Sequence, residues 1–211
     1  MCGLLTGLND RLVADSYPIR RPEDLHTLNG GKKFSKLDLS DAYLQVELDD
    51  ESKKLVVINT QKGLYRYNRL PFGVKSAPLI FQKVMDTTFT GITGTAAYLD
   101  DIIITGRSDE EHMDTLEMVS FRLLEYGFRI KRKKCKFLVD EVEYPWHIVS
   151  AEGVRADPKK TEAVVQMKQL ENVSQLLSFL EMVNFYAHFI PHLTDMAVPL
   201  NTLLRNGVPW T

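Results

Sequence analysis

The stretch TAAYLDDIIITG, residues 95–106, sets two adjacent carboxylates between apolar runs that favour β-strands. Burying unpaired carboxylates is prohibitive, because each charge loses its hydration. Asp100 and Asp101 therefore predict a hairpin whose two short strands enter a sheet while the acids project from its tip into a cleft. An ordinary turn is the alternative, since aspartate is common in turns, although two-residue hairpins favour Asn-Gly or Asp-Gly. The acids alone leave both interpretations open.

A third acid, Asp38, ends another strand-like run, KFSKLDL, at residues 33–39. It could instead cap a helix, a role that Ser40 or Asp41 would serve equally well. Three carboxylates at the ends of neighbouring strands form a hard-oxygen site suited to two Mg²⁺ ions. Two such ions, held ~4 Å apart, activate a hydroxyl nucleophile and stabilise a pyrophosphate leaving group.

The remaining pattern mixes strands and helices as far as residue 155 and is mainly helical afterwards. A helix begins at Pro22, and a short helical stretch follows the strand at 33–39. A hairpin turns at 61–63, an amphipathic helix covers 77–92, and strands and turns occupy 128–154. Helices follow from residue 157, with a break near Asn172 and interruptions at Pro191 and Pro199. This order predicts an α+β domain with a helical appendage.

The clearest helix signal lies at residues 108–127. Ser108 and Glu111 have the spacing of a capping box, and Gly127 is a typical helix end. The apolar positions that predict its buried stripe are Met113, Leu116, Val119 or Phe121, Leu123 and Leu124.

Composition excludes several classes of protein. The 211 residues are 44% hydrophobic and 26% charged with a net charge of −2, so the chain is neither a disordered segment nor a polycation. Its two cysteines, Cys2 and Cys135, form no zinc-ligand spacing or disulfide framework and indicate a reducing intracellular compartment. No apolar run approaches the ~20 residues of a membrane helix, and the first residues do not resemble a signal peptide.

Five blocks of sequence resemble, in the same order, the reverse transcriptases of gypsy-type (Ty3/gypsy) LTR retrotransposons, and together they cover almost the whole chain. The blocks are LDLSDAYLQVEL, NTQKGLYRYNRLPFGVKSAPLIFQKVMD, YLDDIIITG, GFRIKRKKCKF and HIVSAEGVRADPKKTEAV. The resemblance implies an α+β right-hand polymerase fold. A palm with partial fingers would occupy residues 1–155, and a helical thumb or connection-like segment residues 156–211.

By the same resemblance, Asp38 and Asp100 match the principal metal-binding carboxylates, and Asp101 matches a companion that contributes less directly. Leu39 matches the position whose backbone carbonyl completes the metal coordination. Tyr43 matches the aromatic gate that stacks under the sugar and excludes a 2′-hydroxyl, although a core tyrosine is an equal interpretation of the sequence.

The loop LPFGVKSAP, residues 70–78, matches the segment that contacts the incoming nucleotide and the template. Phe72 matches the position where the loop contacts the nucleotide, and Gly73 would allow close approach of the backbone. Lys75 either reaches phosphate or is simply solvated. In the basic run at 129–136, the family pattern suggests Lys134 as the general acid for pyrophosphate release. Lys133 is nearly as plausible.

The implied activity is RNA-directed DNA polymerisation with two Mg²⁺ ions, for which Mn²⁺ can substitute. The implied partners are an RNA or DNA template with a DNA primer, dNTPs, and either a second copy or the remaining polyprotein domains. The implied location is the cytoplasm, a virus-like particle or the nucleus, with no membrane involved. The alternatives are a non-catalytic nucleic-acid-binding or interaction remnant of the same fold and, ranked lower, a palm-fold nucleotide cyclase.

Several residues depart from the family pattern. Leu4 replaces a usual acid, Trp146 stands where a glycine normally admits the primer backbone, and Glu181 also replaces a glycine. The basic fingers segment that grips the triphosphate is expected upstream of Met1. These departures predict a truncated fragment with little or no activity alone.

Overall fold

The structure, a computed structural model, describes residues 6–13, 17–18, 28, 30–144, 147–167, 169–205 and 208. The expected helix start at Pro22, the Leu4 position and Trp146 lie outside these residues. The chain divides into two compact units, Met1–Pro145 with Val149–Gly153, and Trp146–Ile148 with Val154–Thr211. Among the described residues, no helix combines the length and apolar character needed to cross a membrane.

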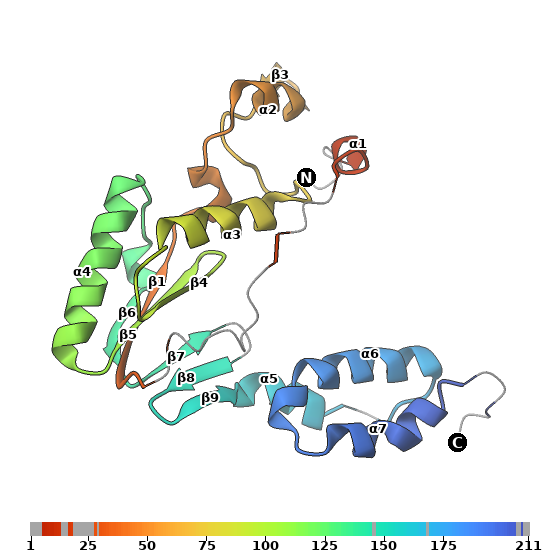
Figure 1. The fold of residues 1–211 in the computed structure, drawn as a ribbon. Coiled ribbons are helices and arrows are strands. Elements are labelled where there is room, and N and C mark those ends of the chain that lie inside the picture. The colour runs from red at the N-terminus through yellow and green to blue at the C-terminus, as the bar shows by residue number, and fades with distance from the viewer. Residues whose placement is uncertain are drawn as a thin grey trace. The chain divides into compact units, whose positions relative to one another are not determined.

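An antiparallel four-stranded sheet is the centre of the first unit (Figure 1). Its order is β4-β5-β1-β6, so β5 and β1 are the inner strands. The bounds of the strands are β1 (Lys33–Asp38), β4 (Thr95–Tyr98), β5 (Asp101–Gly106) and β6 (Lys136–Val139). The strand predicted at 33–39 and the two short strands predicted on either side of the acids are confirmed.

Helices α3 (Ala77–Thr88) and α4 (Asp109–Glu125) share one apolar cluster with this sheet. Successive side chains of a strand point to opposite faces, so Leu37 of β1 faces the helices and Lys36 faces away. The buried cluster comprises Leu37, Leu39, Ala42, Phe81, Met85, Phe89, Ala97, Ile102, Ile104, Val119 and Leu123. The predicted helix at 77–92 ends earlier, at Thr88. The core thus fixes the inner strands on one face and leaves Asp38 and Asp101 on the other.

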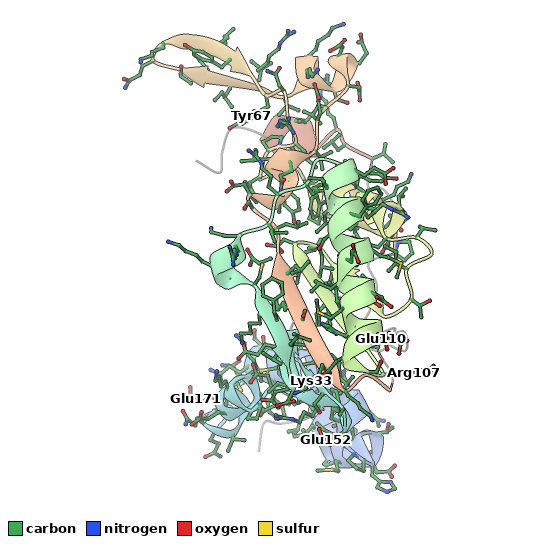
Figure 2. All side chains as sticks on the ribbon, turned by 90° about the vertical axis from the view of Figure 1, so that its left-hand side faces the viewer. Lys33, Tyr67, Arg107, Glu110, Glu152 and Glu171 are labelled. Carbon is green, nitrogen blue, oxygen red and sulfur yellow. The ribbon has the colours of Figure 1, made fainter. Side chains whose placement is uncertain are left out.

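Helix α4 has the predicted ends but a different buried face. The Ser108 hydroxyl accepts the Glu111 N–H at 3.1 Å, and Gly127 adopts φ 74° just after the helix. In Figure 2, Arg107 and Glu110 mark the beginning of α4. The predicted stripe is wrong at two positions that are exposed, Met113 and Leu124, and of the alternatives Val119 and Phe121 it is Val119 that is buried.

Two polar residues of α4 take inward positions, and each has a hydrogen-bond partner for one polar atom, whereas His112 Nδ1 is buried without one among the described residues. The Thr115 hydroxyl donates to the Glu111 carbonyl at 2.8 Å. The fully buried His112 places Nε2 2.8 Å from Ser35 Oγ, which also accepts the Leu138 N–H. The inner face of α4 therefore reads His112, Thr115, Val119 and Leu123.

The stability of the first unit is expected to fall as the pH drops below about 6.5, the ordinary pKa of histidine. Burial lowers the pKa of His112 in the folded chain, so in this pH range the unfolded chain binds the proton more readily. Urea titrations between pH 7.5 and 5 measure the dependence. His112→Gln is expected to flatten it, and an equally steep decline in that variant would contradict this origin.

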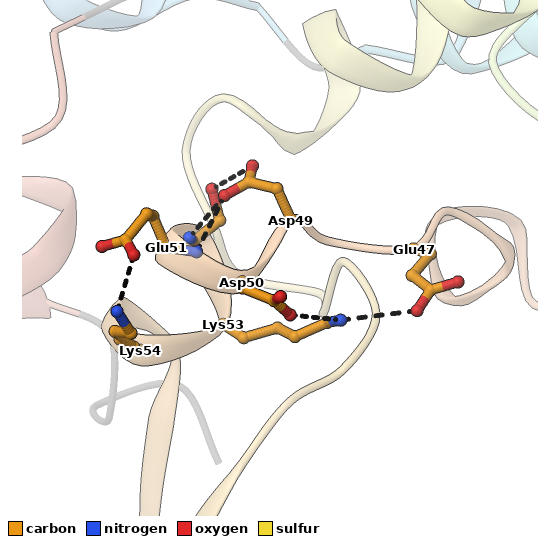
Figure 3. Close-up of polar contacts among 7 residues, drawn as sticks. Glu47, Asp49, Asp50, Glu51, Lys53 and Lys54 are labelled. Carbon is orange, nitrogen blue, oxygen red and sulfur yellow. Dashed lines mark hydrogen bonds and ion pairs between the residues drawn. The ribbon is translucent and has the colours of Figure 1, made fainter.

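The segment between β1 and α3 contains short elements only. They are the 3₁₀ turn η2 (Ala42–Gln45), helix α2 (Asp50–Leu55) and the hairpin strands β2 (Val57–Thr60) and β3 (Gly63–Arg66). The predicted hairpin is confirmed. Helix α2 was not predicted, because it buries no side chain and so has no apolar stripe in its sequence. Polar contacts define it instead (Figure 3). Asp49 accepts the Glu51 and Ser52 amides, and Lys53 and Lys54 pair with acids of the first turn.

The other elements of the first unit are α1 (Thr6–Asn9), the 3₁₀ turn η3 (Arg132–Lys134) and β7 (Glu141–Tyr144). Strands β8 (His147–Ser150) and β9 (Gly153–Ala156) join β7 in a three-stranded sheet of order β7-β8-β9.

The second unit is mainly helical, with α5 (Pro158–Val165), α6 (Val173–Phe185), η4 (Ala187–Phe189) and α7 (Leu193–Thr202). The predicted break near Asn172 is confirmed, since its side chain accepts the Gln175 N–H and caps α6. The predicted interruption at Pro199 is wrong. Pro199 lies inside α7, where its ring removes one donor and the helix still continues to Thr202.

Candidate active site

The three predicted carboxylates come from two neighbouring strands and the turn between β4 and β5. Asp38 at the end of β1 pairs in register with Asp101 at the start of β5. Asp100 is exposed in the two-residue turn that joins β4 to β5. The Leu39 N–H donates to the Asp100 carbonyl at 3.0 Å, so the turn is tied to the strand that carries Asp38. The structure thus brings the three acids to one end of the sheet.

Asp101 is engaged by a lysine of the adjacent strand. Lys36 Nζ lies 2.7 Å from Asp101 Oδ2, and both side chains are about four-fifths buried. Burial raises the pKa of Asp101, whereas the hydrogen bond and charge of Lys36 act in the opposite direction. The nearby charges of Asp100 and Asp38 raise the Asp101 pKa further. The cation therefore compensates one of three clustered negative charges.

Asp38 meets the basic run between α4 and β6. Its carboxylate is largely buried, and Lys134 Nζ lies 3.4 Å from Oδ2. The Asp38 carbonyl accepts the Lys131 N–H at 2.7 Å, which anchors the run beside the strand end. Of the two lysines proposed from sequence, Lys134 makes this ion pair. Its side chain is 59% exposed, so it can leave Asp38 for another anion at little cost.

Tyr43 lies beside the acids in η2, with its ring packed between two phenylalanines. The ring centroids are 5.2 Å from Phe72 and 5.3 Å from Phe81, the latter edge to face. Burial raises the pKa of Tyr43, and the charge of Asp100 adds to the effect. Tyr43 is only partly buried, so part of its side chain remains accessible to solvent.

The loop before α3 holds the other residues proposed to meet a nucleotide. Phe72 is 58% exposed, and Gly73 adopts φ 95°, a conformation that favours glycine. The Asn9 side chain of α1 is hydrogen-bonded to this loop at two positions. Its amide donates to the Gly73 carbonyl at 2.8 Å and accepts the Lys75 N–H at 2.8 Å. Lys75 is exposed, and its position leaves the choice between a phosphate contact and plain solvation open.

A metal cage is not preformed at this site. Across the part of the chain that the structure describes, no three His, Cys, Asp or Glu side chains are arranged to hold a metal ion. Mg²⁺ in phosphate-handling sites is usually bound through one or two carboxylates together with substrate phosphates. The carboxylates of Asp38 and Asp100 are hard-oxygen groups that could serve as such donors, while the Asp101 carboxylate is held by Lys36. The donor chemistry therefore fits Mg²⁺ bound jointly with a nucleotide.

Three residues at the site were not predicted. Lys36 had a signal, because strand alternation puts it on the same face as Asp38. Gln82, whose side-chain oxygen accepts the Leu99 N–H at 2.8 Å next to Asp100, had one too, since it is a polar residue within the apolar stripe of α3 and must find partners when buried. Asn9 had none, because its contacts depend on the tertiary position of α1.

Comparison with known proteins decides the family. The sequence profile described as Reverse transcriptase (RNA-dependent DNA polymerase) matches residues 4–172. The chain belongs to the reverse transcriptase family. The Pol polyprotein from transposon gypsy of Drosophila melanogaster is 30% identical over 201 residues, 94% of this chain and 19% of that protein. The resemblance to gypsy-type elements is confirmed.

A second relative and a solved structure agree with this assignment. The uncharacterized protein K02A2.6 of Caenorhabditis elegans is 46% identical over 175 residues, 83% of this chain. This reverse transcriptase chain spans only 14% of that relative and 19% of the gypsy polyprotein. The foamy viral protease-reverse transcriptase in complex with ds DNA matches with a TM-score of 0.85 at 23% identity, covering 97% of this chain and 37% of that one. At this identity the likeness concerns the fold, and it confirms the predicted α+β polymerase architecture.

Proposed function

We propose that this reverse transcriptase domain performs RNA-directed DNA polymerisation, adding dNTPs to the 3′-end of a primer. One observation carries the proposal. Asp38 and Asp101 are register partners on the inner strands, and the exposed Asp100 adjoins them in a turn bonded to Leu39. Carboxylates from separate strands thus converge beside the Phe72–Gly73 loop and Tyr43, as a polymerase site requires.

Asp38 and Asp100 would hold two Mg²⁺ ions, with help from the Leu39 carbonyl and a lesser contribution from Asp101. When bound, the ions activate the primer hydroxyl and stabilise the departing pyrophosphate. Lys36 keeps the carboxylate of Asp101 in place and limits repulsion among the acids. The exposed ammonium of Lys134 is the candidate proton donor to pyrophosphate, and its flexible stem allows it to move from Asp38.

The aromatic residues would select and seat the nucleotide. Phe81 supports Tyr43 edge to face, so the Tyr43 ring is well placed to exclude a 2′-hydroxyl. Phe72 offers an exposed face to the sugar or base, and Gly73 allows close approach of the backbone. Lys75 is the nearby candidate for a phosphate contact.

The proposed partners are a primer–template duplex and dNTPs. Solved structures of similar fold contain ds DNA or an RNA/DNA hybrid, which supports duplex binding by this chain. A second copy or further polyprotein domains complete the proposed assembly, and its proposed location is intracellular or within a virus-like particle.

Primer extension on poly(rA)/oligo(dT) with Mg²⁺ is the test. Incorporation of dTTP that stops when EDTA is added supports the proposal. Salt-dependent duplex binding without incorporation would instead favour the non-catalytic remnant, because phosphate contacts alone give affinity that falls steeply with salt. The same assay tests the expectation that the chain alone is impaired.

A further inference from the structure

Gln82 of α3 is fully buried and its amide is bonded to the hairpin that carries Asp100. Its Nε2 donates to the Ala97 carbonyl at 3.0 Å, and its Oε1 accepts the Leu99 N–H at 2.8 Å. Ala97 and Leu99 stand on either side of Tyr98, directly before the acids. One side chain therefore holds both the last part of β4 and the first residue of the turn.

The turn that Gln82 holds is strained. Leu99 adopts φ 52°, a left-handed conformation that is unfavourable for an ordinary L-residue because Cβ comes too close to the following carbonyl oxygen. Such conformations persist only where surrounding contacts determine them. The Leu99 N–H would lose its buried acceptor if the turn relaxed, so the hydrogen bond to Gln82 opposes relaxation.

Asp86 fixes which way the Gln82 amide points. Asp86 Oδ1 accepts from Gln82 Nε2 at 3.1 Å, and Asp86 Oδ2 accepts from the Tyr17 hydroxyl at 2.6 Å. A flipped amide would turn Gln82 Oε1 toward both the Asp86 carboxylate and the Ala97 carbonyl. All three groups are hydrogen-bond acceptors, so neither hydrogen bond could form. The Gln82 oxygen therefore has to face the Leu99 N–H.

We propose that Gln82 is a positioning residue that holds the Leu99–Asp100 turn in its strained conformation and so presents the Asp100 carboxylate beside Asp38. The inference rests on the proposed function, because the purpose of the positioning is metal binding by these acids. The hydrogen bond from Leu39 to the Asp100 carbonyl holds the turn from the β1 side, and Gln82 holds it from the helix side.

Gln82→Leu removes all three hydrogen bonds of the amide, to Ala97, Leu99 and Asp86, and puts an apolar side chain of similar size in its place. It is expected to weaken Mn²⁺ binding by about 10–100-fold, as for other residues that orient metal ligands. The measurement is electron paramagnetic resonance on the chain with a non-hydrolysable dTTP analogue and without primer or template, because the described residues form no preformed metal cage. In primer extension, we expect a lower kcat and a higher half-saturating Mg²⁺ concentration, with little change in the KM for dTTP.

Thr88→Val is the matched control in the same helix. It removes a buried hydrogen bond, from the Thr88 hydroxyl to the Val84 carbonyl, on a residue with no exposed surface. It is expected to lower stability without changing Mn²⁺ affinity. If both variants weaken Mn²⁺ binding equally, or if Gln82→Leu leaves it intact, Gln82 is only a packing residue and the proposal fails.

A pair of variants that exchanges the carboxylate and the amide between positions 82 and 86 keeps the test independent of folding defects. Gln82→Glu retains an acceptor for Leu99 but faces the Asp86 carboxylate, so it is expected to impair Mn²⁺ binding. Adding Asp86→Asn supplies a donor and is expected to restore much of the loss, and failure to restore it would contradict the role given to Asp86. Intact Mn²⁺ binding with no extension by the unmodified chain would overturn the polymerase proposal instead.

Discussion

Replacing Asp100 with asparagine is expected to lower primer extension by about 1,000-fold or more. The variant keeps the size of the side chain and the exposed turn but removes the charge that would hold Mg²⁺ together with Asp38. Metal ions contribute several kcal/mol of transition-state stabilisation, and about 4 kcal/mol corresponds to a factor of 1,000 in rate. Single-nucleotide incorporation on poly(rA)/oligo(dT) over a range of Mg²⁺ concentrations measures the loss.

Two further variants show whether the loss belongs to the site. Asp140→Asn changes another exposed acid, which pairs with Lys33, and is expected to leave extension unchanged. Asp101→Asn is expected to cost less than Asp100→Asn, because the Asp101 carboxylate is already engaged by Lys36. Comparable activity in Asp100→Asn and the unmodified chain would exclude the proposed metal role.

The sequence predicted the scaffold of the site well because the inner strands are locally consistent. Asp38 ends a strand of alternating residues, and the Asp100–Asp101 pair interrupts an apolar run, so both signals lie within a few residues. Their convergence required knowledge of strand order, which came from the resemblance and not from periodicity. The structure adds the register pair Asp38 and Asp101.

Prediction failed where tertiary contacts overrode local pattern. In α4, a hydropathy stripe placed Met113 and Leu124 inside, whereas His112 and Thr115 occupy the inner face because Ser35 and a helix carbonyl bond them. Hydropathy alone cannot anticipate a polar residue that is satisfied by a distant strand.

The dependence on tertiary contacts also explains why the sequence suggests a role for Asp101 but does not reveal its ion pair with Lys36. Lys36 was visible as a polar position on a strand, but its reach to the neighbouring strand depends on the antiparallel register. Its second bond, to the Glu143 carbonyl, comes from a residue more than 100 positions away. Sequence reasoning therefore identifies acids that do chemistry more readily than the groups that hold them.

Phe81→Ala is expected to lower the unfolding free energy of the first unit by about 3–5 kcal/mol. Phe81 has no exposed surface and packs edge to face against both Tyr43 and Phe128. Its removal leaves a cavity among α3, η2 and the sheet and ends two aromatic contacts, each worth roughly 0.5–1.5 kcal/mol. Since the total free energy of unfolding of a domain is about 5–15 kcal/mol, this single substitution removes a large part of the stability of the first unit.

Urea unfolding, together with hydrogen exchange of the amides of the fully buried residues Ile102–Ile104, measures the loss. Phe121→Ala is the matched control, because Phe121 lies on α4 with 66% of its surface exposed and is expected to change stability by less than about 0.5 kcal/mol. If Phe81→Ala does not fold, Phe81→Leu leaves a smaller cavity and a measurable protein. Equal effects of the Phe81 and Phe121 variants would mean that this cluster does not hold Tyr43 and the acids together.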